Sequence, residues 1–284
     1  MQKYFLLLVL SLIWGSQFMF MALITQDANP FFISFIKALL GALFLTALTL
    51  IFKRKNYQAQ WGLYVFIAMF EVVFPFVFIA FGQKFVSSGV SAVIMALVPV
   101  FTLIIMFFAT SKKLKIYEIV AVFLGFVGVV FISWNPQNFN IQMLLGLISL
   151  LLAAFSFAIS LVLMQRLKSP TPILHMRNVL GIASVVLFII VLILPQGFDF
   201  HFDEIQWSSL IILGVVHSAI AYVIYNILAR QHGALFASFS NYLVPIIGLL
   251  LGFLFLNETI GFISFIGILI VFISLFISQQ YNEK

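Results

Sequence analysis

Long apolar runs alternate with short polar segments along the whole chain. Ten of these runs are each close to the roughly 20 residues that an α-helix needs to cross the hydrocarbon core of a bilayer. The runs cover residues 4–24, 30–52, 62–82, 88–109, 115–133, 141–164, 172–194, 207–229, 235–256 and 260–278. The first run has full spanning length and no small-residue cleavage site, which argues against a cleavable signal peptide. The pattern therefore predicts an all-α membrane protein with ten transmembrane helices.

Composition supports this interpretation and excludes a soluble protein. Hydrophobic residues make up 64% of the 284 residues and charged residues only 8%, whereas a soluble domain carries about 25% charged residues. The polar connections are too short for a further domain, the longest running from Pro195 to Gln206. The chain has no cysteine, which excludes disulfides and thiolate metal sites.

The basic residues fall on one side of the predicted membrane. Basic loops mark the cytoplasm, so both termini are expected there, in a multi-pass protein of the bacterial inner membrane. The opposite side receives a single basic residue, Lys84, together with Asp27 and Glu258. The cytoplasmic set is Lys3, Lys53, Arg54, Lys55, Lys112, Lys113, Lys115, Arg166, Lys168, Arg230 and Lys284.

The chain also repeats itself. The tripeptide Leu-Val-Pro at 97–99 recurs at 243–245, an offset of 146 residues. A unit of five helices used twice enters the membrane from opposite sides, which is the construction of many secondary transporters. The predicted units are residues 1–134 and an inverted copy at 141–278, with a cytoplasmic tail at 279–284.

Two stretches carry a resemblance to a known family. One is "LIWGSQFMF" (residues 12–20), followed by Asn29-Pro30 and Lys37. The other is "LVPIIGLLLGFLFLNETIG" (residues 243–261), which contains Glu258. Together with the length and the predicted spans, they resemble the EamA-type branch of the drug/metabolite transporter superfamily. The resemblance implies a secondary transporter that moves small metabolites or drugs, often outward, through a cavity between the two halves.

The chain departs from the family pattern at two positions. The family usually has Arg where this chain has Lys37, which keeps the charge but loses the bidentate fork of a guanidinium. The family also usually has a carboxylate in the short loop of the first half that matches Glu258, and here that position is Lys112.

Ionisable residues inside predicted spans are treated as functional candidates, because charge in hydrocarbon is unfavourable. Glu71 and His217 lie midway along the runs 62–82 and 207–229 and differ by the repeat offset. We expect them to face one central cavity from opposite halves. Two structural alternatives stay open: Glu71 pairs with Lys37, or His217 bonds a neighbouring backbone group or hydroxyl such as that of Ser218.

Lys37, about two turns into its run, is a further candidate for substrate binding, with anchoring at the membrane interface as the alternative. Other polar residues are weaker candidates, with helix packing as the alternative. Trp14 and Gln17 are three apart, and Tyr222 and Asn226 are four apart, so each pair shares a helix face. Asn241 lies one turn before a proline. Prolines within the runs are expected to kink helices and to give gates a place to bend; these are Pro75, Pro99 and Pro245.

Catalytic motifs such as a phosphate loop, HExxH or a Cys-His cluster do not occur in the sequence. We therefore expect a monomeric, non-enzymatic transporter that works by alternating access and needs no cofactor, metal or nucleic acid. It exports or exchanges amino acids or amphiphilic compounds, with proton coupling as an option. Two alternatives remain. One is a channel-like uniporter, and the other is a lipid-handling membrane enzyme that uses Asp199, His201 and Asp203.

Overall fold

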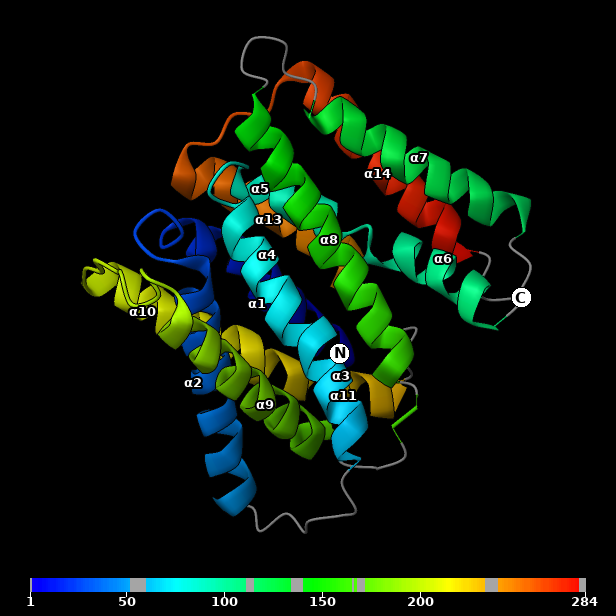
Figure 1. Cartoon of the computed structure of the whole chain (residues 1–284). Helices are drawn as coiled ribbons and strands as arrows, with labels where there is room; N and C mark the ends of the chain where they lie inside the picture. The colour runs from blue at the N-terminus through cyan, green and yellow to red at the C-terminus, as the bar shows by residue number, and fades with distance from the viewer. Residues whose placement is uncertain are drawn as a thin grey trace.

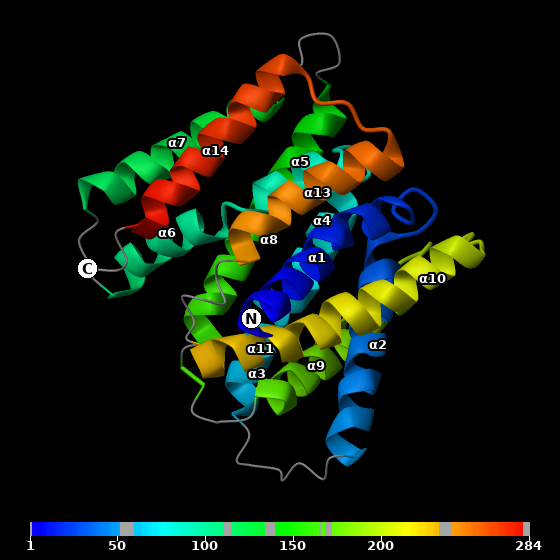
Figure 2. The same ribbon diagram turned by 180° about the vertical axis from the view of Figure 1, so that it is seen from behind.

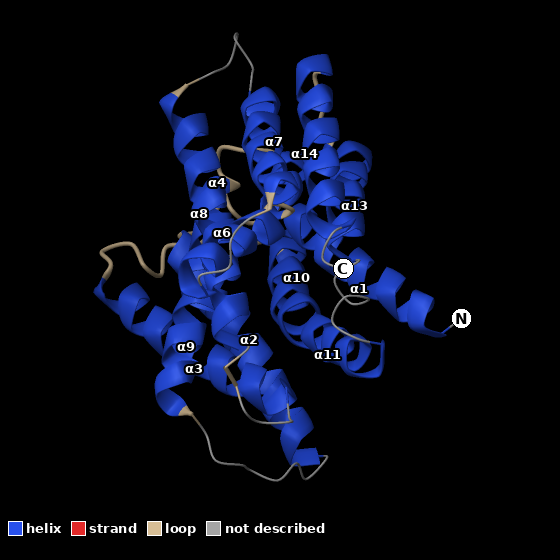
Figure 3. Ribbon diagram, turned by 90° about the vertical axis from the view of Figure 1, so that its right-hand side faces the viewer, coloured by secondary structure: helices blue, strands red, loops and turns tan. Residues whose placement is uncertain are grey.

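The protein is helical throughout the part of the chain that the structure describes. The computed structural model describes residues 2–51, 60–110, 115–133, 140–164, 166–167, 172–232 and 240–280. Within these residues the β-structure is limited to a single bridge, between Ala28 and Phe200. Figure 3 shows the helices, coloured blue, with the connecting loops at their ends.

The helices of the first half follow the predicted runs closely. The run at 62–82 is one continuous helix built from α3, η1 and α4, and the run at 88–109 is split between Met95 and Val98 into α5 and α6. The elements are α1 (Gln2–Ala22), α2 (Pro30–Ile51), α3 (Trp61–Ala68), η1 (Met69–Val73), α4 (Phe74–Gly82), α5 (Ser88–Met95), α6 (Val98–Thr110) and α7 (Ile116–Ser133).

The second half repeats this arrangement. Its middle run, 207–229, is again a continuous helix in three parts, α10, η2 and α11. The elements are α8 (Ile141–Met164), α9 (Pro172–Ile193), α10 (Glu204–Ile212), η2 (Leu213–Ile220), α11 (Ala221–His232), α13 (Ser240–Leu256) and α14 (Phe262–Gln280).

Seven of these helical stretches are long and apolar enough to cross a membrane, and three more are shorter apolar helices. The shorter ones are Ile116–Phe131, Leu243–Leu256 and Phe262–Ser274. Length and composition of these helices make the chain a multi-pass membrane protein.

Both three-part helices contain a π-helical segment, η1 and η2. In η1 the cause is Pro75, which has no N–H for the carbonyl of Glu71 four residues earlier and whose ring crowds that carbonyl. In η2 two side chains enter the hydrogen-bond ladder. The Ser218 hydroxyl donates to the Leu213 carbonyl at 3.0 Å, and His217 Nδ1 lies 3.1 Å from the Ile212 carbonyl oxygen. Segments of this kind are frequent at functional sites.

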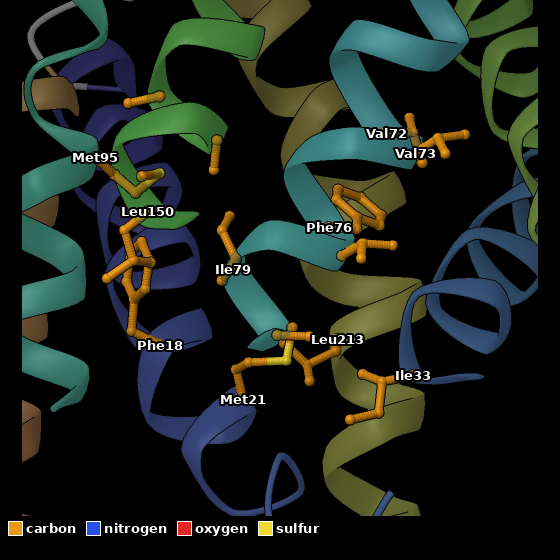
Figure 4. Packing of buried hydrophobic residues seen from close by; sticks show 14 of the residues in the cluster. Phe18, Met21, Ile33, Val72, Val73, Phe76, Ile79, Met95, Leu150 and Leu213 are labelled. Atoms are coloured by element: carbon orange, nitrogen blue, oxygen red, sulfur yellow. The ribbon is translucent and has the colours of Figure 1, made fainter. Parts of the chain in front are cut away.

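The two halves share one hydrophobic core. Helices of the first half pack mainly on helices of the second: α7 on α14, α2 on α9, α1 on α13 and α4 on α8. Figures 1 and 2 show α7 and α14 side by side at one edge of the molecule, away from α1 and α2. One cluster of buried side chains runs from Phe18 to Val271, and Figure 4 shows part of it, with Phe18 near Leu150 and Met21 near Leu213.

The connection before α2 is tied to the connection before α10. His201 N–H donates to the Asp27 carbonyl at 3.1 Å, and Gln206 Nε2 donates to the Asp27 carboxylate at 2.6 Å. Phe32 stacks on Phe200 with ring centroids 4.4 Å apart. On the same side, burial lowers the pKa of Lys84, and the charge of Asp27 partly offsets this shift. These contacts hold the two connections together at the end of the helix bundle where Asp27 lies.

Candidate functional site

The candidate site is built around Glu71, which η1 places in the interior with 5% of its surface exposed. The hydroxyl of Tyr222, on α11, donates a hydrogen bond to Glu71 Oε1. The carboxylate and its donor therefore come from opposite halves of the chain. This interaction fixes one of the two carboxylate oxygens.

The second oxygen, Glu71 Oε2, is buried and has no hydrogen-bond partner among the described residues. The Ser160 hydroxyl, on α8, is buried beside the carboxylate and can act on it as a donor, although the two groups do not meet regular hydrogen-bond geometry. An unpaired buried acceptor is unfavourable by about 1–3 kcal/mol. Oε2 is thus free to accept from a shifted Ser160 hydroxyl, to take a proton, or to pair with a cationic group of a ligand.

Aromatic rings stand next to this carboxylate. Trp14 contacts Tyr222 with ring centroids 5.9 Å apart and Tyr225 with centroids 5.4 Å apart. Tyr225 is also close enough to Glu71 to interact with it electrostatically. A carboxylate with aromatic faces beside it suits an ammonium group, through ion pairing and cation–π attraction. Gln17 is half-buried one turn from Trp14, and no hydrogen bond joins it to a described residue.

Lys37 provides a second buried ionisable group, on α2. Its side chain is 2% exposed, and its Nζ lies 3.9 Å from the ring centroid of Phe76, on α4. Within the described residues no carboxylate lies within ion-pair distance of Lys37, so the structure does not pair it with Glu71. Lys37 is a buried cation with an aromatic face as its neighbour.

His217 lies on η2, near Lys37 and α1. Its Nε2 is 3.1 Å from the Ser16 hydroxyl, and its ring packs against Phe20 with centroids 5.6 Å apart. Nδ1 faces the Ile212 carbonyl, which only accepts, so Nδ1 carries a hydrogen. The Ser16 hydroxyl also lies 2.9 Å from the Ile13 carbonyl, so its one proton serves either that carbonyl or His217.

The structure joins Glu71 to Tyr222 and His217 to Ser16, and no hydrogen bond or ion pair joins Glu71 to His217 among the described residues. The side chains of Asn226, Asn241 and Pro99 lie outside what the structure describes. Helix α13 runs through Pro245 without interruption, whereas the break between α5 and α6 comes just before Pro99.

The acidic loop does not gather its candidates into one site. Asp203 caps α10 by accepting from Gln206 N–H at 2.8 Å, while Asp199 and His201 are exposed and 3.7 Å apart. Among the described residues, no three His, Asp or Glu side chains are placed together to hold a metal ion. The geometry gives the lipid-handling alternative no support.

Sequence reasoning missed three side chains of the site, Ser160, Tyr225 and Phe76. Ser160 follows Ser156 by four residues, so a polar stripe on one face of α8 was a usable signal. Tyr225 follows Tyr222 by three residues and falls on the same helical face. Phe76 had no signal among the many phenylalanines of the chain.

Comparison with known proteins places these features in a family. The profile of the EamA-like transporter family matches residues 1–134 and again residues 144–279. An "Uncharacterized transporter YoaV" of Bacillus subtilis is 25% identical over 280 residues, covering 94% of this chain and 93% of that protein. An "Uncharacterized transporter" of Archaeoglobus fulgidus is 23% identical and covers 98% of each chain.

A solved structure described as "Crystal structure of protein" shares the fold. It has a TM-score of 0.66 and 14% identity, and the match covers 99% of this chain and 98% of that one. Two profile matches that together span nearly the whole chain identify it as a member of the EamA-like transporter family.

Proposed function

We propose that the protein is a secondary transporter that exports or exchanges small zwitterionic metabolites such as amino acids, including amphiphilic ones, by alternating access. Family membership and relatives named transporters support transport across a membrane. Seven long and three shorter apolar helices support ten spans. Two successive profile matches support two five-helix repeats at 1–134 and 141–278, inverted with both termini in the cytoplasm.

The observation that carries the substrate class is the pair of unmatched ionisable groups. Glu71 lacks a partner for Oε2, and Lys37 has an aromatic ring in place of a carboxylate. Phe76, whose ring lies against Lys37 Nζ, follows Glu71 by five residues along one helix. This corresponds to roughly 7 Å along the helix axis. An α-amino acid with a hydrogen bond of about 2.9 Å at each end has the length to span this axial separation.

In this arrangement Glu71, with Tyr222 bonded to it and Trp14 behind Tyr222, receives the ammonium group, and Lys37 receives the carboxylate. His217 and Ser16 lie at the carboxylate end. Phe76 and Tyr222 occupy equivalent positions of the two halves, 146 residues apart, and so do Trp14 and Ser160. This offset supports a site that is built from equivalent positions of both halves. Phe76 lies against Lys37, and Tyr222 donates to Glu71. These two equivalent rings therefore serve opposite ends of the proposed site.

Proton coupling is the second part of the proposal. A neutral Glu71 carries its proton on Oε2 and needs no donor there, with the Ser160 hydroxyl beside it to accept after a small shift, so a proton suits the site when no substrate fills it. We therefore expect proton and substrate to alternate at Glu71. If Glu71→Gln keeps transport but loses its dependence on a pH gradient, Glu71 carries the proton and is not the substrate anchor.

Counterflow into proteoliposomes tests the function. Vesicles loaded with a mixture of unlabelled amino acids are diluted into each labelled amino acid in turn, and labelled amines and carboxylates of similar size serve as comparison. We expect transient, saturable accumulation of one or more amino acids and none of the comparison compounds. Flux that neither saturates nor shows counterflow supports a channel-like uniporter instead, and the absence of any flux contradicts the transport proposal.

A further inference from the structure

A carboxylate bridges two helices of different halves at the end of the bundle opposite the cytoplasmic loops. Glu258, in the connection after α13, accepts from Ser88 N–H at 2.6 Å through Oε1. Its Oε2 accepts from Gly89 N–H at 2.9 Å. These two N–H groups belong to the first turn of α5, whose own cap, Ser87, serves Val90. A charged acceptor at the positive end of a helix makes strong hydrogen bonds.

The local chain conformation directs Glu258 toward α5. Asn257 has a φ of 53°, in the left-handed region that Asn tolerates and that ends helices. The Glu258 N–H then bonds back to the Gly252 carbonyl at 3.1 Å. A Cβ at Gly252 would lie 2.4 Å from Glu258 Oε2, so glycine is what allows the carboxylate to sit between α13 and α5.

The same helix also touches the candidate site. A Cβ at Gly15, on α1, would lie 2.6 Å from Ile247 of α13, so α13 packs closely on α1 at the residue next to Trp14. A movement of α13 away from α5 therefore shifts the contact beside Trp14, whose ring packs on Tyr222, the donor to Glu71. The Glu258 contact and the substrate site are mechanically connected through α13 and α1.

We propose that Glu258 is a latch that holds this end of the transport pathway closed through Ser88 and Gly89, and that both hydrogen bonds break whenever this end opens. The proposal rests on the alternating access proposed above. The first half has no carboxylate at the position that corresponds to Glu258. The position 146 residues earlier is Lys112, and a lysine side chain donates hydrogen bonds but accepts none. Without substrate, the protein therefore favours the state closed at the Glu258 end.

The absence of cysteine from the chain allows a direct test without substrate. Ser91 of α5 is fully buried behind the latch, and Ser91→Cys is close to isosteric. Its labelling by a membrane-impermeant maleimide is timed in right-side-out and inside-out vesicles, alone and combined with Glu258→Ala. We expect labelling from the Glu258 side to rise roughly tenfold or more, since charge-assisted hydrogen bonds are lost, and labelling from the opposite side not to rise.

Two glycine variants make the test independent of the folding of Glu258→Ala. Gly252→Ala keeps the glutamate but pushes its carboxylate away, so it is expected to raise Ser91→Cys labelling in the same way. Gly181→Ala is the matched control, because nothing lies within 4 Å of its added Cβ. Thr259→Cys, at an exposed position of the same connection, reports how readily this side is labelled at all.

An unchanged labelling rate in folded Glu258→Ala or Gly252→Ala, judged by a monodisperse peak in size exclusion, overturns the latch. A rise from the opposite side overturns it as well. The readout needs no transported compound. A labelling response in a protein that moves none of the tested amino acids therefore contradicts the proposed substrate class and leaves the latch standing.

Discussion

At the scale of single residues, sequence position identified the ionisable side chains but not their partners. Glu71 was found because a carboxylate in an apolar run is unfavourable without a function or a partner. Its donor Tyr222 lies 151 residues away, and the neighbouring Ser160 comes from a third helix. Such contacts depend on how helices of the two halves rotate against each other, which one sequence does not specify.

The donor to Glu71 is tested by Tyr222→Phe, which keeps the ring and removes the hydroxyl. Both carboxylate oxygens then lack a partner, so we expect a loss of about 1–3 kcal/mol in stability and a rise of roughly tenfold in the KM for counterflow. Thermal unfolding and initial rates measure the two effects. Tyr225→Phe is the matched control three residues on, and an equal effect there would show that the Tyr222 hydroxyl has no particular role.

At the scale of elements, the hydrophobic pattern located most helices to within a few residues. The run 141–164 coincides with α8, and 30–52 differs from α2 by one residue. The apolar pattern itself did not predict the two π-helical segments or the break before Pro99. Pro75 and Pro99 marked two of these places in the sequence without giving the form of the irregularity, and η2 depends on hydrogen bonds such as that of Ser218 to the Leu213 carbonyl, which leave the apolar pattern unchanged.

The π-helical segment η1 is tested by Pro75→Ala. An alanine N–H can bond the Glu71 carbonyl and favours a regular α-helix, so we expect the variant to be more stable, because proline inside a helix is unfavourable by about 3 kcal/mol. The altered register turns Glu71 away from Tyr222, and counterflow should fall. Unchanged counterflow in a variant of raised melting temperature would contradict a role for η1 in placing Glu71.

The contact of α7 with α14 is tested by Gly128→Leu. A Cβ at Gly128 would lie 2.9 Å from the Gly267 carbonyl oxygen, so the larger side chain must separate the two helices. We expect a loss of about 1–3 kcal/mol in stability, measured as a lower melting temperature in detergent. Gly62→Ala, with nothing within 4 Å of its added Cβ, is the control and should change it little.

At the scale of the whole molecule, the two halves interlock rather than form separate domains. The sequence repeat indicated two units, but every major helix pair named above joins one half to the other. Because α1 packs on α13 and α2 on α9, neither half can move without changing contacts made by the other. The repeat offset alone did not predict this arrangement, since it relates positions in sequence and says nothing of their packing.

Membrane orientation is the property of the whole chain that the loop charges predict. Thr259→Cys and Lys115→Cys are both at exposed positions at opposite predicted ends. We expect an impermeant thiol reagent to label Thr259→Cys in intact cells, and to label Lys115→Cys only in inside-out vesicles. Labelling of both positions from the same side would contradict the predicted topology.

The central claim is that Glu71 and Lys37 hold the two charged ends of one small substrate. The most direct measurement is counterflow of the labelled amino acid that wild-type protein accumulates best, compared among wild type, Glu71→Gln and Lys37→Met. Both substitutions keep side-chain size and remove one charge. Leaving a buried charge of the substrate unpaired costs about 2–5 kcal/mol, so each folded variant should lose counterflow roughly thirtyfold or more. Wild-type counterflow in either folded variant would contradict the account.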